Sequence, residues 1–141
     1  MESPEIGLAT DEEISEVGSW LRRNLRAFNE GFLGPNQAAP VASVAKVNGD
    51  IVGGMSGVVI QKWLSVEIVF LDEKYRGLGL GERLLLTLEE EARKLGATRA
   101  FVDTTTFQAE GFYVKFGYVE WGRFRDFAPG VDRIYMRKDK L

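Results

Sequence analysis

Apolar residues along the chain recur with two periods, and these periods separate helical segments from extended ones. Between residues 14 and 29 they recur every three or four positions, which places them on one face of a helix. Thr10 and Glu13 have the spacing of a capping box that begins this helix. The segment Gly31–Pro40 has the composition of a loop, and a short strand is predicted at Glu5–Leu8.

The rest of the chain alternates between short apolar runs and turn residues. Asn48 and Gly49 separate two such runs and tolerate positive φ, so they predict a β-hairpin. A mostly apolar strand, a Leu-rich helix that stops at Gly96 and a further strand form a β-α-β unit, whose two strands are expected to be parallel. The predicted strands are Val41–Val47, Ile51–Ile60, Leu64–Leu71, Arg99–Thr104, Val119–Arg125 and Arg133–Arg137, and the helices after the third and fourth strands are expected at Leu80–Leu95 and Gln108–Phe116.

This order of elements predicts an α/β fold with a mixed, mostly antiparallel sheet, in which a central β-α-β unit is flanked by helices. A single domain over residues 1–141 is expected, since domains most often contain about 100–150 residues.

Composition limits the chemistry that this fold can carry. The chain has no Cys and no His, which excludes disulfides, thiolate zinc sites, cysteine nucleophiles and imidazole bases, and no metal site is expected. Its 18 Lys and Arg against 21 Asp and Glu give a net charge of −3, which argues against nucleic acid as a partner. The N-terminus has no signal-peptide pattern, and no apolar stretch approaches the roughly 20 residues that span a membrane, so we expect a cytoplasmic protein.

The segment with the clearest chemical signal joins the third predicted strand to the Leu-rich helix. Arg76 is followed by glycines at 77, 79 and 81, which can turn their amides toward one point at a helix N-terminus. Such a nest suits a phosphate or pyrophosphate. The glycine spacing fits neither the dinucleotide fingerprint nor the P-loop. The alternative is a glycine-rich turn that binds no ligand.

At this point the sequence resembles the GNAT family of acyl-CoA-dependent N-acyltransferases. Arg76, Gly79 and Gly81 match the family pattern Gln/Arg-x-x-Gly-x-Gly/Ala, and Ala109–Tyr118 matches its Ala-x-x-Phe-Tyr-x-Lys-x-Gly-Phe/Tyr segment. The chain departs from many relatives at Glu73, where they have Pro, and at Thr106, where they have Asn.

The resemblance implies that acetyl-CoA binds where Leu64–Leu71 splays away from the neighbouring strand Arg99–Thr104. It assigns backbone groups of Val69, Phe70 and Leu71 to pantetheine and the thioester carbonyl, and it leaves Thr106 as a pantetheine contact through its hydroxyl. The expected pyrophosphate ligands are Arg76 and the amides of Gly77, Leu78, Gly79, Leu80 and Gly81.

Two side chains are candidates for proton transfer. Tyr113 matches the family tyrosine that protonates the departing thiolate, although it could instead pack a short helix. Glu67 is an acid within an apolar strand and is a candidate base; alternatively it pairs with Lys62 or Arg99, or lies at an exposed strand end.

These observations predict an N-acetyltransferase that moves an acetyl group from acetyl-CoA directly to a primary amine of a small molecule or peptide. Two rival hypotheses are a catalytically silent acyl-CoA sensor or scaffold and a phosphate-loop module for another nucleotide. The resemblance also makes a homodimer plausible. Side chains that could border the amine acceptor are the aromatic residues Phe28, Phe32, Trp121 and Phe124 and the acids Glu30 and Asp126.

Overall fold

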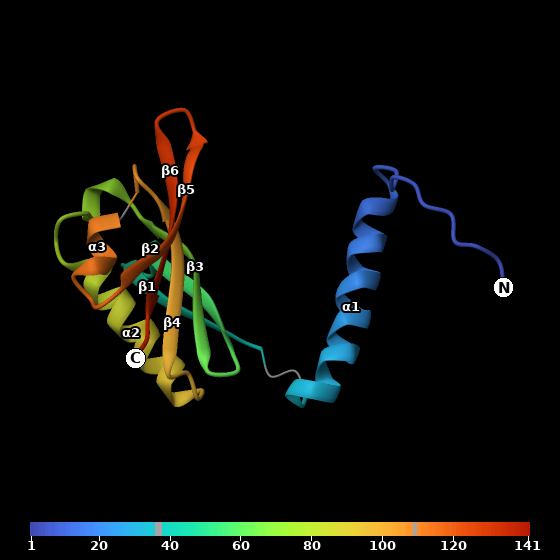
Figure 1. The fold of residues 1–141 in the computed structure, drawn as a ribbon. Coiled ribbons are helices and arrows are strands. Elements are labelled where there is room, and N and C mark those ends of the chain that lie inside the picture. Colours follow the sequence, from blue (N-terminus) through green and yellow to red (C-terminus); the bar gives the residue numbers. More distant parts are fainter. Residues whose placement is uncertain (36–37, 109) are drawn as a thin grey trace. The chain divides into compact units, whose positions relative to one another are not determined.

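The computed structural model describes residues 1–35, 38–108 and 110–141, and the chain forms two compact units, residues 1–36 and 37–141 (Figure 1). The first unit contains one helix, and the second contains a six-stranded sheet with its helices. The elements are α1 (Glu13–Leu33), β1 (Ala39–Val47), β2 (Asp50–Ile60), β3 (Trp63–Leu71), the 3₁₀ turn η1 (Glu73–Tyr75), α2 (Leu80–Lys94), β4 (Arg99–Thr105), α3 (Glu110–Val114), β5 (Val119–Ala128) and β6 (Val131–Lys138).

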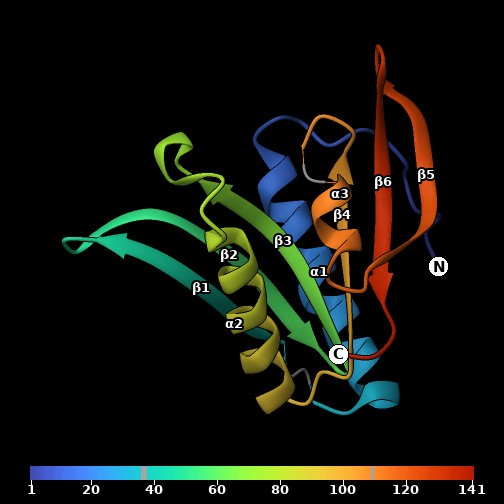
Figure 2. The same cartoon turned by 90° about the vertical axis from the view of Figure 1, so that its left-hand side faces the viewer.

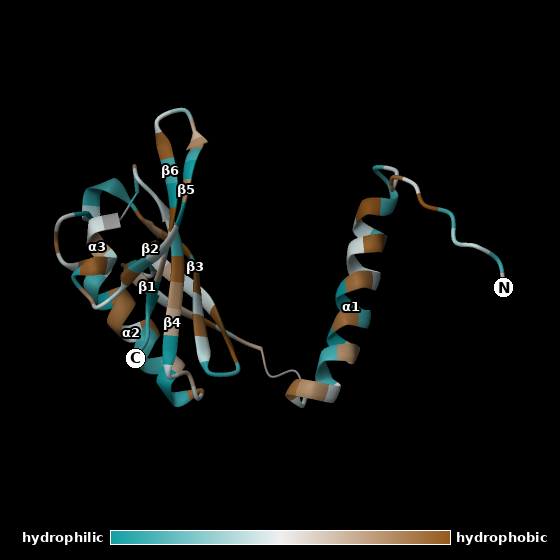
Figure 3. Ribbon diagram, in the orientation of Figure 1, coloured by the Kyte–Doolittle hydropathy of each residue, from teal (hydrophilic) through white to brown (hydrophobic). Residues whose placement is uncertain are grey.

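The first unit is an amphipathic helix with a capped N-terminus. The Thr10 amide donates to Glu13 Oε2 at 3.1 Å and the Glu13 amide donates to Thr10 Oγ1 at 3.3 Å, which confirms the predicted capping box. Apolar residues recur along the length of α1 (Figure 3), yet none of its residues is buried. The helix runs to Leu33, beyond the predicted loop start at Gly31. The strand predicted at Glu5–Leu8 is wrong, because this segment has no pairing partner among the described residues.

The second unit confirms the predicted mixed sheet. Its strand order is β1-β2-β3-β4-β6-β5, with β3 in the interior, and β3–β4 is the parallel pair among otherwise antiparallel neighbours. The first hairpin turns at Asn48 and Gly49, whose φ values are +50° and +86°, as an Asn-Gly turn requires. Both closing strands are longer than predicted, because they continue to pair with each other toward their shared turn.

The core lies between one face of the sheet and α2, with α3 on the same side (Figure 1). Leu84, Leu85 and Leu88 of α2 are at most 5% exposed and pack into one cluster with Leu64 and Ile134 of the sheet. Their spacing of three and four residues is the reason that α2 presents one apolar face. Within the described residues of the second unit, no element covers the opposite face of the sheet, which we call the open face.

Two irregularities in β3 shape the centre of the sheet. The β3–β4 pairing covers only Trp63–Val66 against Arg99–Val102, and beyond these residues the two strands diverge (Figure 2). On the other side of β3 the register with β2 shifts at Glu67, which is an extra residue in β3. Such a bulge bends its strand and re-aims its side chain. The result is a gap in the sheet that begins directly beside Glu67.

Candidate active site

The gap between β3 and β4 exposes backbone groups of β3. The Asp72 amide donates to the Val52 carbonyl of β2 at 2.8 Å. Because successive residues of a strand direct their backbone groups to alternate sides, those of Phe70 point to β2 while those of Val69 and Leu71 point into the gap. Two of the three backbone positions that the sequence predicted for pantetheine therefore lie in the gap.

Arg76 lies directly after the 3₁₀ turn and folds back onto β3. Its Nε donates to the Leu71 carbonyl at 2.8 Å, and its guanidinium carbon lies 5.8 Å from the centroid of the Phe70 ring. The sequence did not predict this anchoring of the strand end. The terminal guanidinium nitrogens of Arg76 form no salt bridge among the described residues, which keeps them available for an anion.

The glycine loop begins α2 with two residues in the left-handed region. Gly77 has φ +76° and Gly79 has φ +78°, and a Cβ at either position would meet no atom within 4 Å. The need for glycine here is therefore conformational and not steric. Gly79 caps α2, so the amides of Leu80 and Gly81 belong to the first turn and have no partner within the helix. This arrangement fits the diphosphate of acetyl-CoA.

Gly81 has a different structural reason. A Cβ at this position would lie 3.3 Å from Phe112 Cε2, so the missing side chain allows α3 to pack closely over the first turn of α2. The two matched sequence patterns, one at residues 76–81 and one at 109–118, meet at this contact.

Tyr113 of α3 is 2% exposed and packs edge-on against Tyr118, with ring centroids 5.5 Å apart. Burial, followed by the negative charge of Asp103, raises the pKa of Tyr113 from 10.0 to about 12. The phenol therefore stays protonated at neutral pH and can act as a hydrogen-bond donor.

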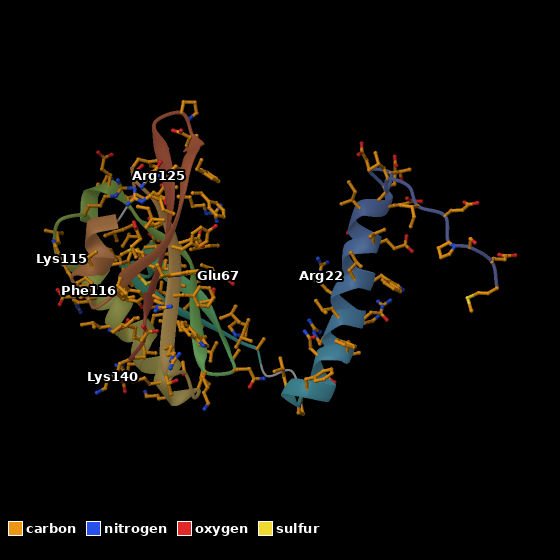
Figure 4. The ribbon with its side chains drawn as sticks, in the orientation of Figure 1. Arg22, Glu67, Lys115, Phe116, Arg125 and Lys140 are labelled. Carbon is orange, nitrogen blue, oxygen red and sulfur yellow. The ribbon has the colours of Figure 1, made fainter. Side chains whose placement is uncertain are left out.

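Glu67 projects from the bulge on the open face (Figure 4). Neither Lys62 nor Arg99 forms a salt bridge with it among the described residues, and the Arg99 guanidinium instead lies 5.6 Å from the centroid of the Trp63 ring. The exposed carboxylate is thus placed beside the gap without an ionic partner in the described chain.

The open face of β4, β5 and β6 carries an aromatic cluster that the sequence predicted in part. Trp121 and Phe124 pack edge-on against Tyr135, at centroid distances of 6.0 and 5.0 Å. Arg133 lies 5.2 Å from the centroid of the Phe127 ring and donates to Asp103 through Nε and Nη2. This bonding raises the pKa of Arg133 above its ordinary value, so the guanidinium stays charged.

The other predicted acceptor residues have separate locations. Phe28 and Phe32 contact each other on α1 at 5.4 Å and are exposed in the first unit, as is Glu30. Asp126 has φ +52° in the closing hairpin, where its amide donates to Asp132 Oδ1 at 3.1 Å. A hydrogen bond from Arg123, reinforced by this amide, lowers the pKa of Asp132.

Thr106 is tied to β6 by two hydrogen bonds. Its amide donates to the Asp132 carbonyl at 3.1 Å, and its hydroxyl oxygen accepts from the Asp132 amide at 3.2 Å. The hydroxyl that the sequence assigned to pantetheine therefore already has a partner in the protein.

A buried ionic cluster was missed by sequence reasoning. Glu89 of α2 is 1% exposed and accepts from the Tyr118 hydroxyl at 2.8 Å and from Lys138 Nζ at 3.1 Å. Burial, and then the charge of Glu89, raises the pKa of Tyr118. The one sequence signal was an acid on the apolar face of the helix, four residues after Leu85.

The diverging parallel strands and the glycine loop at the α2 N-terminus are the arrangement that the resemblance to the GNAT family implied. Residues 7–118 match the family model described as "Acetyltransferase (GNAT) family", so the chain belongs to the GNAT family. It is an acetyl-CoA-dependent acyltransferase, as its relatives also indicate.

Three relatives illustrate the similarity. The chain is 39% identical over 92 residues to a blasticidin-S acetyltransferase from Streptomyces morookaense. The aligned residues cover 64% of this chain and 68% of that protein. The crystal structure of an acetyltransferase from Bacillus cereus has a TM-score of 0.85 and 28% identity, and covers 98% of both chains. The structure of a Bacillus anthracis acetyltransferase in complex with acetyl-CoA has a TM-score of 0.64 at 23% identity, and the alignment covers 76% of this chain and 66% of that one.

No helix among the described residues combines the length and the hydrophobicity needed to cross a bilayer. No group of three acidic side chains in the described part of the chain is placed to hold a metal ion.

Proposed function

We propose that this protein transfers the acetyl group of acetyl-CoA directly to a primary amine, with both substrates bound at the same time. The observation that carries the proposal is the gap between β3 and β4, which lies between the glycine loop and the open face. A substrate bound through its diphosphate at the loop can reach the gap, where an amine approaches from the other side. The chain has no Cys to carry the acyl group, which favours direct attack.

Backbone groups and the glycine loop supply binding and polarisation. The amides of the loop from Gly77 to Gly81, together with Arg76, bind the diphosphate. Val69 and Leu71 direct their backbone groups into the gap, where an N–H can donate to the thioester carbonyl and stabilise the negative charge that develops there.

Tyr113 stabilises the leaving thiolate. Burial holds the pKa of Tyr113 at about 12, above the roughly 8.5 of an ordinary cysteine thiol, so the phenol retains its proton more strongly than a thiol does. We therefore assign Tyr113 the role of a hydrogen-bond donor to the departing sulfur. The proton released by the amine leaves through Glu67, directly or through a water molecule.

The acceptor is proposed to be a cationic amine. The Glu67 carboxylate, which has no ionic partner among the described residues, attracts an ammonium group, and aromatic rings on the same open face offer a surface for its apolar part. Blasticidin S, the compound in the name of the Streptomyces relative, is the first acceptor to test. A cytoplasmic location, a single domain over residues 1–141 and a homodimer stay predictions.

The test combines titration calorimetry with a thiol-release assay. Acetyl-CoA and free CoA should bind with micromolar affinity while ATP does not, and an amine panel that includes blasticidin S should release free CoA thiol. Binding without turnover of any amine would favour the silent-sensor hypothesis. Absence of binding to either CoA species would refute the proposed function.

A further inference from the structure

The end of β4 carries a run of threonines with unequal hydrogen bonding. The Thr104 hydroxyl donates to Gln108 Oε1 at 3.4 Å, and the Thr106 hydroxyl accepts from the Asp132 amide at 3.2 Å. The Thr105 hydroxyl oxygen is buried and has no hydrogen-bond partner, and among the described residues it is the sole buried side-chain nitrogen or oxygen in this state.

A buried hydroxyl without a partner destabilises the folded state, so its retention calls for a reason. The backbone amide and the backbone carbonyl of Thr105 are both hydrogen-bonded to Gln108. Its amide donates to Gln108 Oε1 at 3.2 Å, and its carbonyl accepts from the Gln108 amide at 3.0 Å. The hydroxyl is therefore fixed at this site by the turn that follows β4.

The position of Thr105 relative to the gap indicates the ligand. It lies three residues beyond Val102, the last β4 residue paired with β3, and the same step beyond Val66 reaches Val69. The alternation of side chains along β4 places Thr105 on the open face with Asp103, because Thr104 is buried toward the core. The partner of Thr105 on β6 is Arg133, whose guanidinium is bound to Asp103.

We propose that the Thr105 hydroxyl donates a hydrogen bond to the carbonyl oxygen of the acetyl group of acetyl-CoA. The inference rests on the proposed function. The diphosphate site lies at the N-terminus of α2 on the covered side of the sheet, and the amine approaches from the open face. The acetyl group must then lie in the gap between them, where Thr105 and the backbone of Val69 flank it.

The proposed hydrogen bond involves only the acetyl group, so it distinguishes acetyl-CoA from free CoA. Removing the hydroxyl should weaken the binding of acetyl-CoA and leave that of free CoA unchanged, since CoA lacks the carbonyl. One neutral hydrogen bond corresponds to an affinity change of about threefold to tenfold.

The experiment measures both dissociation constants by calorimetry for the full chain and for Thr105→Val, Thr105→Ser and Thr106→Val. Thr105→Val should raise the Kd of acetyl-CoA about threefold to tenfold, keep the Kd of CoA, and raise the ligand-free Tm by about 3 °C or more, because the orphan hydroxyl is gone. Thr105→Ser keeps the hydroxyl and should bind acetyl-CoA like the wild type.

Thr106→Val is the matched control. It loses the bond from the Asp132 amide, so its Tm should fall while the ratio of the two Kd values stays that of the wild type. If Thr105→Val does not fold, Thr105→Ala removes the same hydroxyl, and its two Kd values are read in the same way. If Thr105→Val leaves the ratio of the acetyl-CoA and CoA Kd values unchanged, whether or not both are weakened, the Thr105 assignment alone is overturned. Wild-type protein that binds neither ligand would overturn the proposed function itself.

Discussion

Replacing Lys138 by methionine tests the buried ionic cluster that supports Tyr113. Lys138 Nζ lies 3.1 and 3.3 Å from the two oxygens of the Glu89 carboxylate, and the Tyr118 hydroxyl lies 2.8 Å from one of them. The substitution would leave a carboxylate that is 1% exposed with one neutral donor. The ring of Tyr118 in turn packs against Tyr113, so the cluster connects α2 to the candidate active site.

The magnitude follows from the burial of the pair. Breaking a buried ion pair by removing one partner destabilises a protein by about 3–5 kcal/mol. The Lys138 side chain is 19% exposed and methionine keeps most of its aliphatic stem, so we expect the lower end, about 3 kcal/mol. For a unit of this size, that free energy corresponds to a Tm decrease of roughly 12 °C.

The assay is guanidinium and thermal unfolding followed by circular dichroism, with an unchanged m-value as evidence that the variant keeps its compactness. Lys140→Met is the matched control, since Lys140 is exposed (Figure 4) and its loss should change stability by less than about 0.5 kcal/mol. Adding Glu89→Gln to Lys138→Met should recover part of the loss because no charge stays buried. A single variant within about 0.5 kcal/mol of the wild type, or a double variant no better than the single, would refute the reasoning.

Further predictions concern the site and the sheet beside it. Gly79→Ala should reduce acetyl-CoA affinity about tenfold in calorimetry. An alanine at φ +78° is strained by about 1–2 kcal/mol, and relief of that strain turns the loop amides away from the ligand. The control Gly130→Ala, at φ +72° in the closing hairpin, should show the strain without the loss of affinity. Tyr113→Phe should lower kcat about 100-fold while acetyl-CoA affinity stays the same, and an unchanged kcat in the thiol-release assay would remove the proposed role of Tyr113. Because the pKa of Tyr113 is raised from 10.0 to about 12, its contribution to stability is present below pH 10 and is lost as the pH rises toward 12, so the phenylalanine variant should lose less stability across that window. Glu67→Gln should depress amine turnover most strongly at low pH, where the ammonium form dominates, and a pH profile identical to that of the wild type would dismiss the base. Gly57→Ala should destabilise the fold by about 2–3 kcal/mol in denaturant unfolding, because its Cβ would overlap the Ser65 carbonyl oxygen next to the bulge, whereas Gly122→Ala has room and should change stability little.

Local signals in the sequence were sufficient for much of the fold. The Asn48-Gly49 turn, the capping box at Thr10 and the helical spacing of α2 each depend on residues within one element, and the structure agrees with all three. The glycine loop was recognisable for the same reason, since positive φ at Gly77 and Gly79 depends on the missing side chain alone.

Features that depend on pairing between distant segments could not be predicted in this way. The bulge at Glu67 is defined by the register of β3 with β2, and the bonds of Glu89 require α2, Tyr118 and Lys138 to meet. The strand predicted at Glu5–Leu8 failed for a related reason, because extended backbone is stabilised by a neighbour and not by its own composition.

The short β3–β4 strip has a mechanical consequence. It joins two antiparallel three-stranded halves, β1-β2-β3 and β4-β6-β5, through only the pairs from Trp63–Arg99 to Val66–Val102. If the pantetheine arm lies against Val69 and Leu71 as proposed, it replaces the missing stretch of strand and connects the two halves of the sheet. Bound pantetheine would thus occupy the place of the missing strand pairing between β3 and β4. Amide hydrogen exchange at Val69 and Leu71 should therefore be fast in the free protein and slow once CoA is bound.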